Sequence, residues 1–152
     1  MSRRRRLPPG LYGLDELTLG DRIETGTLQV EAARIDAFAE LTGDRFEIHM
    51  TDAAAARHGF TGRVAHGLLV LSLVDGLKNG APARIKARAS LGWDWRFDAP
   101  VIAGDTIRAE LEVAETRATR HPDRGIVRLD FEVRNHRGEL VQSGCNRLMV
   151  YA

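Results

Sequence analysis

The sequence predicts one α+β domain in which an antiparallel β-sheet wraps around a long central α-helix. Three observations support this prediction. A chain of 152 residues has the length of a single domain, one segment is apolar on nearly every side of a helix, and four long segments with strand character follow it. A helix of this kind has to be covered all round, and a curved sheet supplies the cover. This is the hot-dog layout.

The first ten residues read differently from the rest of the chain. Residues 3–6 are all arginine, and two prolines and a glycine follow at positions 8–10. A short basic run at a chain terminus is typical of a solvated tail. We therefore expect a disordered basic tail over residues 1–10 and a hot-dog domain over residues 11–152.

The elements ahead of the central helix are short. Residues 22–30 have moderate β-propensity and predict a strand. Apolar residues recur at helical spacing over 31–41, and Gly43 then ends the predicted helix. Residues 44–62 are polar, with an alanine-rich stretch and glycines, and predict a loop with one small helix.

The second half begins with the most apolar segment, residues 68–77, which predicts the buried helix. Asn135 to Gly138 supply a hairpin turn between the last two strands. Alternating or β-branched character predicts four antiparallel strands over residues 84–97, 106–120, 126–135 and 139–151.

Composition narrows the class of protein. The net charge is only +1 with 28% charged residues, so no global field favours nucleic acid or an anionic membrane. No apolar stretch reaches membrane-spanning length and no apolar segment follows the arginines, so we expect a cytoplasmic protein. The single Cys145 has no metal or redox spacing around it and is expected to be a partly buried strand thiol.

Asp44 and His49 are the first candidates for chemistry. A spacing of five residues brings two side chains together only if the chain turns between them, which Gly43 and the loop composition allow. A carboxylate and an imidazole that converge hold one water molecule, and one group takes a proton while the other delivers one. By residue type alone, an aspartate after a glycine and a single histidine also fit ordinary structural roles.

The segment His66-Gly67 stands at the predicted start of the apolar helix. Unpaired backbone N–H groups and the helix dipole favour negative charge at that point. A thioester oxygen against the Gly67 N–H would be polarised, and a developing enolate would be stabilised. A plain helix start is the alternative interpretation.

These two segments resemble the MaoC-like dehydratases, which include the (R)-specific enoyl-CoA hydratases. That family carries Gly-Asp-x-Asn-Pro-x-His and then Ala-His-Gly-Met/Leu, which correspond to residues 43–49 and 65–68 here. Residues 97–101 match its Phe-x-x-Pro-Val pattern, and residues 104–107 match its Gly-Asp strand connection.

The resemblance implies that Asp44 is the general base that activates water, that His49 shares the water and the proton transfer, and that Gly67 supplies the oxyanion contact. It further implies a homodimer, with an acyl tunnel near the subunit interface and the CoA part along the surface. We expect no metal and no redox cofactor, since no histidine or carboxylate spacing indicates one.

Two departures from the family pattern leave alternatives open. Phe46-Glu47 replaces Asn-Pro, and Glu47 either faces solvent or raises the pKa of Asp44 by like-charge repulsion. On the central helix, Asp75 stands where relatives carry a serine, while Ser72 matches another small residue. Hot-dog thioesterases use a carboxylate on that helix, so thioester hydrolysis is the leading alternative.

The predicted function is reversible addition of water to a 2-enoyl-CoA, with a catalytically inactive acyl-CoA binding module as the third possibility. Arg57 and Arg63 flank the candidate site, where they would meet CoA phosphates as bidentate donors or remain solvated. We expect the substrate contacts to come from His66, Arg57, Arg63, Ser72 and Asp75.

Overall fold

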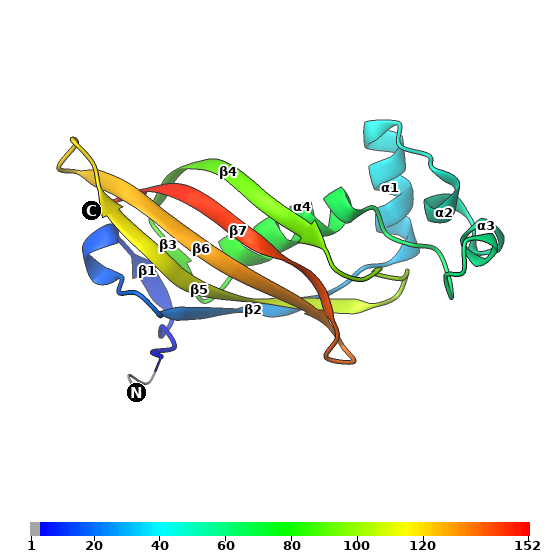
Figure 1. The fold of residues 1–152 in the computed structure, drawn as a ribbon, viewed down its shortest axis with the longest axis horizontal. Coiled ribbons are helices and arrows are strands. Elements are labelled where there is room, and N and C mark those ends of the chain that lie inside the picture. Colours follow the sequence, from blue (N-terminus) through cyan, green and yellow to red (C-terminus); the bar gives the residue numbers. More distant parts are fainter. Residues whose placement is uncertain (1–3) are drawn as a thin grey trace.

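A five-stranded antiparallel sheet dominates the computed structural model, which describes residues 4–152. Its strand order is β2-β5-β6-β7-β4, and one long helix, α4 (Gly67–Asn79), lies along it (Figure 1). This arrangement confirms the predicted α+β hot-dog fold. The strands are β2 (Arg22–Gln29), β4 (Ala87–Phe97), β5 (Thr106–Ala118), β6 (Arg124–Asn135) and β7 (Leu140–Tyr151).

The core forms between α4 and the concave side of the sheet. Leu69, Val70 and Val74 of α4 are buried with alternate residues of β5 and β6, such as Leu111 and Leu129. Alternation places every second side chain of a strand on the same face, which is why these strands could be located from their pattern.

The helix is covered on one side only, so the expectation of all-round burial is wrong. Leu68 is 60% exposed, and Ser72 and Gly76 are exposed as well. The five strands curve round one side of α4, and the elements at its ends are too short to cover the rest. The side of α4 that faces away from the sheet therefore carries one exposed leucine and two small residues.

Three short helices gather at one end of the sheet, while β1 and the C-terminus lie toward the other (Figure 1). They are α1 (Ala32–Thr42), α2 (Glu47–Met50) and α3 (Asp52–Arg57). Gly43 adopts a left-handed conformation with φ of 78° and ends α1, as predicted. Where one small helix was expected in the following segment, the structure has two.

Residues 4–10 are ordered by contacts with the domain, so the prediction of a disordered tail is wrong for them. The Arg5 guanidinium bonds both carboxylate oxygens of buried Asp21, at 2.9 and 2.6 Å. Leu7 is only 5% exposed. A bidentate ion pair and a buried leucine offset the entropy that a free tail would keep. Residues 1–3 of the predicted tail lie outside the described residues.

The small elements complete the fold. β1 (Gly10–Tyr12) pairs in parallel with β3 (Ala83–Ile85), and a short 3-10 helix, η1 (Leu14–Glu16), follows β1. The predicted turn between the last strands is confirmed by the Gly138 N–H donating to the Asn135 carbonyl at 3.0 Å. Within residues 4–152, no helix has both the length and the apolar character that crossing a membrane requires.

Candidate active site

A cavity of about 510 Å³ lies at the N-terminal end of α4. Asp44, His49, His66 and Gly67 all line it, together with apolar side chains that include Phe60, Leu68, Val70 and Val101. Asp44 comes from the loop after α1, His49 from α2, and the other two from the start of α4. The loop therefore turns as the sequence required, and the two predicted segments meet in one cavity.

The position of the proton on His49 follows from its contacts. Nδ1 of His49 lies 2.6 Å from the Val64 carbonyl oxygen, which can only accept, so Nδ1 carries the hydrogen. Nε2 of the neutral ring therefore presents a lone pair. Burial lowers the pKa of His49 below its ordinary value, although the bond to Val64 acts in the opposite direction. His49 is thus held as a neutral imidazole with one free acceptor.

His66 is fixed by the same logic and packs against His49. Its Nε2 lies 2.9 Å from the backbone carbonyl of Asp44, so Nε2 donates and, in the neutral form of the ring, Nδ1 carries the lone pair. That Nδ1 is buried and has no hydrogen-bond partner among the described residues. The two imidazoles stack with centroids 3.9 Å apart. His66 therefore ties the Asp44 loop to the start of α4.

The polar atoms of Asp44, His49 and His66 lie within 4.8 Å of one another. This spacing accommodates a water molecule about 2.8 Å from each of two partners. A tetrahedral metal site needs bonds of about 2.0 to 2.1 Å whose directions converge, whereas the lone pairs of two stacked rings lie in two ring planes that are only 27° from parallel. Of the two, the arrangement suits a shared water better.

Local hydrogen bonds hold the Asp44 loop open toward the cavity. The Phe46 N–H donates to Oδ1 of Asp44 at 3.2 Å, and the Asp44 N–H donates to the Thr42 hydroxyl at 3.1 Å. Asp44 is exposed in the single chain. One of its oxygens thus shapes the turn, and the carboxylate remains reachable by a ligand.

The substituted pair Phe46-Glu47 leaves Asp44 and His49 lining the same cavity. The Phe46 ring makes an edge contact with His49, at 5.9 Å between centroids. Glu47 points to α3 and its surroundings, where Nε2 of His58 lies 2.6 Å away and Arg57 3.4 Å away. The hydrogen bond from His58 lowers the pKa of Glu47. Its carboxylate is exposed and engaged away from Asp44, which agrees with the first of the two expectations.

Gly67 is the first residue of α4, and any larger residue there would displace the Phe97 ring. A Cβ added at this position would lie 2.5 Å from the Phe97 ring. The ring therefore packs directly on the helix start, where the first backbone N–H groups have no partner within the helix. The predicted oxyanion contact thus has a donor, a helix dipole and an apolar cover.

Gln142 belongs to this site and was missed by the sequence analysis. It lies on β7, is 2% exposed, and donates from Nε2 to the Gly67 carbonyl at 3.1 Å. Its Oε1 accepts from the Trp95 indole at 2.8 Å. The segment Val141-Gln142-Ser143 carries no motif, and only the pairing of β7 with β4 brings Gln142 beside Phe97.

The other predicted contact residues lie outside the cavity lining. Arg63 donates from Nε to the His49 carbonyl at 2.8 Å and pairs with Asp36, so it braces α2. Arg57 pairs with Glu47. Ser72 donates to the carbonyl of Leu68 and is exposed, and Asp75 forms an ion pair with Lys78 at 2.7 Å. Of these four, only Arg63 contacts the pair, through the backbone carbonyl of His49, and none of the four lines the cavity.

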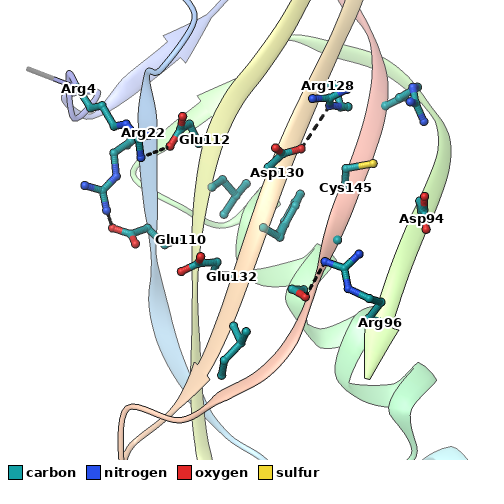
Figure 2. A pocket seen from close by; sticks show the side chains of 16 residues that line it. Arg4, Arg22, Asp94, Arg96, Glu110, Glu112, Arg128, Asp130, Glu132 and Cys145 are labelled. Carbon is teal, nitrogen blue, oxygen red and sulfur yellow. Dashed lines mark hydrogen bonds and ion pairs between the residues drawn. The ribbon is translucent and has the colours of Figure 1, made fainter. Parts of the chain in front are cut away.

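A larger hollow of about 750 Å³ lies on the opposite, outer face of the sheet. Figure 2 shows it lined by arginine and carboxylate side chains from several strands. Arg22 pairs with Glu110, and Arg128 lies 3.3 Å from Asp130. Arg22 and Glu110 pair across β2 and β5, whereas Arg128 and Asp130 are two residues apart on β6, and Nε of Arg128 has no hydrogen-bond partner among the described residues. The single cysteine, Cys145, lines this hollow and is partly buried on β7, as expected.

Comparison with known proteins shows the family of the chain. Residues 16–134 match the family model described as MaoC like domain. The chain is 34% identical over 113 residues to the (R)-specific enoyl-CoA hydratase of Aeromonas caviae, a match that covers 74% of this chain and 81% of that protein. It is 36% identical over 90 residues to the 3-hydroxybutyryl-CoA dehydratase of Methylorubrum extorquens, covering 57% of this chain and 55% of the relative.

Solved structures give the same result. The crystal structure of a MaoC-like dehydratase from Rhodospirillum rubrum superposes with a TM-score of 0.83 at 28% identity, covering 92% of this chain and 97% of that one. The chain therefore belongs to the MaoC-like dehydratase family. Relatives in that family are named as hydratases and dehydratases, which are hydro-lyases.

Proposed function

We propose that this protein adds water reversibly to a 2-enoyl-CoA, with Asp44 and His49 as its acid/base pair. The observation that carries the proposal is that the Asp44 carboxylate, the free Nε2 of buried His49 and the start of α4 at Gly67 all face one cavity. Water addition needs a base, a group that returns the proton to carbon and an anion-stabilising contact. Asp44 with His49 takes the proton from water and returns it to C2, and the Gly67 N–H is the anion-stabilising contact.

The geometry supports the following steps in the hydration direction. The thioester oxygen accepts a hydrogen bond from the Gly67 N–H, which draws electrons from the C2–C3 double bond. Asp44 removes a proton from the water that it shares with His49, and the water oxygen bonds to C3. The electron pair of the double bond moves into the thioester as an enolate, and C2 then takes a proton from the Asp44–His49 pair. The reverse sequence is dehydration.

A homodimer agrees with the exposed surfaces of the chain. β4 is an edge strand whose residues are largely exposed, and Leu91 on it is 52% exposed. Leu68 and Phe97, at 60% and 58%, add apolar surface beside the cavity. Edge strands and apolar patches of this kind invite pairing with a second chain. We expect light scattering in solution to give twice the mass of 16.8 kDa.

Thioester hydrolysis is less well supported than hydration. Its candidate carboxylate, Asp75, forms an ion pair with Lys78 and does not line the cavity. The binding-module alternative needs Asp44 and His49 to be misplaced, and they converge instead. We also expect turnover without a metal or redox cofactor, so activity should survive chelation.

Turnover of a panel of 2-enoyl-CoA substrates tests the proposal, with loss of the enoyl thioester absorbance and release of free CoA followed separately. We expect enoyl loss without CoA release, and Asp44→Asn should lower kcat by about 10² or more because a general base is removed. Asp94→Asn, on the outer hollow, is the matched control and should leave kcat unchanged.

Each other outcome selects another function. CoA release that is insensitive to Asp44→Asn would contradict hydration and support a thioesterase. Binding of acyl-CoA with no turnover of any substrate in the panel would support the binding module.

A further inference from the structure

We infer that Gln142 is a positioning residue for the reaction, which holds the oxyanion contact at Gly67 in place through a hydrogen-bonded chain that begins at Trp95. This inference rests on the proposed hydratase function. It starts from the fact that Gln142 is a polar residue with 2% exposure in a largely apolar core, where an amide without partners would be costly.

The orientation of the Gln142 amide is determined by its neighbours. The Trp95 indole can only donate, so the atom 2.8 Å from it must be Oε1 of Gln142. The Gly67 carbonyl can only accept, so the atom 3.1 Å from it must be Nε2. With the amide reversed, its NH2 group would face the Trp95 N–H, and its oxygen would face the Gly67 carbonyl oxygen. Trp95 therefore aims the Gln142 N–H at the start of α4.

Gly67 needs such support from outside its own helix. As the first residue of α4 it is held by few helical bonds, and its lack of a side chain removes any rotamer that would anchor it. The Phe97 ring presses on it from one side. The bond from Gln142 ties its carbonyl to β7, so the backbone N–H groups of the first turn keep a fixed position relative to the sheet.

The strand register explains why this position is suited to the task. Gln142 pairs with Phe97 across β7 and β4, and the Asp98 and Ala99 N–H groups both donate to the Val141 carbonyl. One short stretch of β7 thus fixes both the ring that covers Gly67 and the amide that holds it. A shift of about 1 Å in such a contact lowers a rate by about 10².

The test compares Gln142→Met, which keeps the side-chain length and loses both hydrogen bonds, with wild type on the best 2-enoyl-CoA substrate. We expect kcat to fall about tenfold, less than the 10² to 10³ typical of losing a direct oxyanion donor. KM should change by less than about twofold, since the bond acts on the transition state. Trp95→Phe keeps an aromatic ring and should cause a smaller fall in kcat.

Asn146→Leu is the matched control because it also removes a fully buried amide from β7. Asn146 bonds Ser90, Gly92 and Lys78, and it does not line the cavity. It should lower stability without changing kcat of the folded enzyme. A Gln142→Met enzyme that loses only stability, like this control, would overturn the inference and leave the proposed function standing.

In Gln142→Glu, the pH dependence of the rate distinguishes a donor role from a purely structural one. The ionised carboxylate can accept from Trp95 but cannot donate to the Gly67 carbonyl, whereas the protonated form can. Burial raises the pKa of a carboxyl at this position, so the protonated form is populated as the pH falls. Asp44, His49, His66 and Asp98 line the same cavity, so each rate is divided by the wild-type rate at the same pH.

That ratio should rise as pH falls through the pKa of the introduced carboxyl, and a ratio that stays flat through that pKa would contradict a donor role for residue 142. If wild type turns over no 2-enoyl-CoA at all, the proposed function itself fails, and the role of Gln142 in the reaction fails with it.

Discussion

The two hollows of this protein lie on opposite faces of the same sheet and differ in how their polar groups are satisfied. The outer hollow is the larger, at about 750 Å³, and its ion pairs join partly exposed side chains such as Arg22 and Glu110, although Nε of Arg128 is buried without a hydrogen-bond partner among the described residues. The inner cavity, at about 510 Å³, contains two buried imidazoles, of which His66 leaves Nδ1 without a partner among the described residues.

This difference shows why size is a poor guide to a functional site. Exposed ion pairs are solvated and contribute little, so a hollow lined with them needs no ligand. A buried imidazole nitrogen without a partner costs free energy, and such a cost is typical of sites where a ligand supplies the missing bond. The inner cavity is therefore the better candidate for a functional site, and changes there should affect turnover more than changes at the outer hollow.

Loss of the His49 imidazole should have the largest effect. We expect His49→Gln to lower kcat by about 10² or more, because the group that shares the water and the proton transfer is removed. His136→Gln, at the exposed turn between β6 and β7, is the control and should retain wild-type kcat. Steady-state kinetics on the same 2-enoyl-CoA measures both, and equal rates for the two variants would remove His49 from the mechanism.

Gly67→Ala should affect both stability and turnover. The added Cβ would meet the Phe97 ring at 2.5 Å, and overpacking of this kind costs about 1 to 3 kcal/mol. We expect a lower free energy of unfolding in urea and a fall in kcat, both partly restored by Phe97→Leu in the same chain.

Gly76→Ala provides the comparison within the same helix. Gly76 is exposed and a Cβ there meets nothing within 4 Å, so the change should stabilise α4 by up to about 1 kcal/mol. If Gly67→Ala behaved like Gly76→Ala, the close contact with Phe97 would not be a constraint on the site.

Local patterns account for what could be predicted from the sequence. Alternation located β5, β6 and β7 to within a few residues, and Gly43 ended α1 as expected because both signals are local. The convergence of Asp44 and His49 came from the family pattern, since spacing alone left it open.

What the sequence could not reveal depends on contacts between distant residues. The tail over residues 4–10 is ordered by Asp21, and Gln142 joins the site only through the pairing of β7 with β4. The one-sided cover of α4 depends on the curvature of the sheet. None of these carries a periodicity, and each needs the three-dimensional arrangement before it can be recognised.

The buried state of His49 predicts a pH dependence of stability. Its pKa is lowered in the folded protein, chiefly by burial, from an ordinary value of 6.5. Below that pH the unfolded chain binds a proton that the folded chain does not, so stability should fall as pH drops from 6.5 through the folded pKa. Urea unfolding at several pH values measures this, and His49→Gln should weaken the dependence.

If the free energy of unfolding fell equally with pH in wild type and in His49→Gln, the dependence would belong to other groups. Glu47 is one candidate, since its lowered pKa gives stability that is lost at more acidic pH, as the carboxylate becomes protonated. The two groups are distinguished by their windows, because His49 acts just below 6.5 and Glu47 acts below its ordinary value of 4.5.

The outer hollow should give the smallest effect. Arg128 lies 3.3 Å from Asp130 and 3.7 Å from Glu115, and all three are partly or fully open to solvent. Arg128→Gln should therefore change the free energy of unfolding by less than about 1 kcal/mol, with a smaller change at high salt, and leave kcat at the wild-type value. A large loss of turnover in this variant, with stability intact, would mean that the outer face takes part in function and that its paired charges are exchanged for bonds to a ligand or partner.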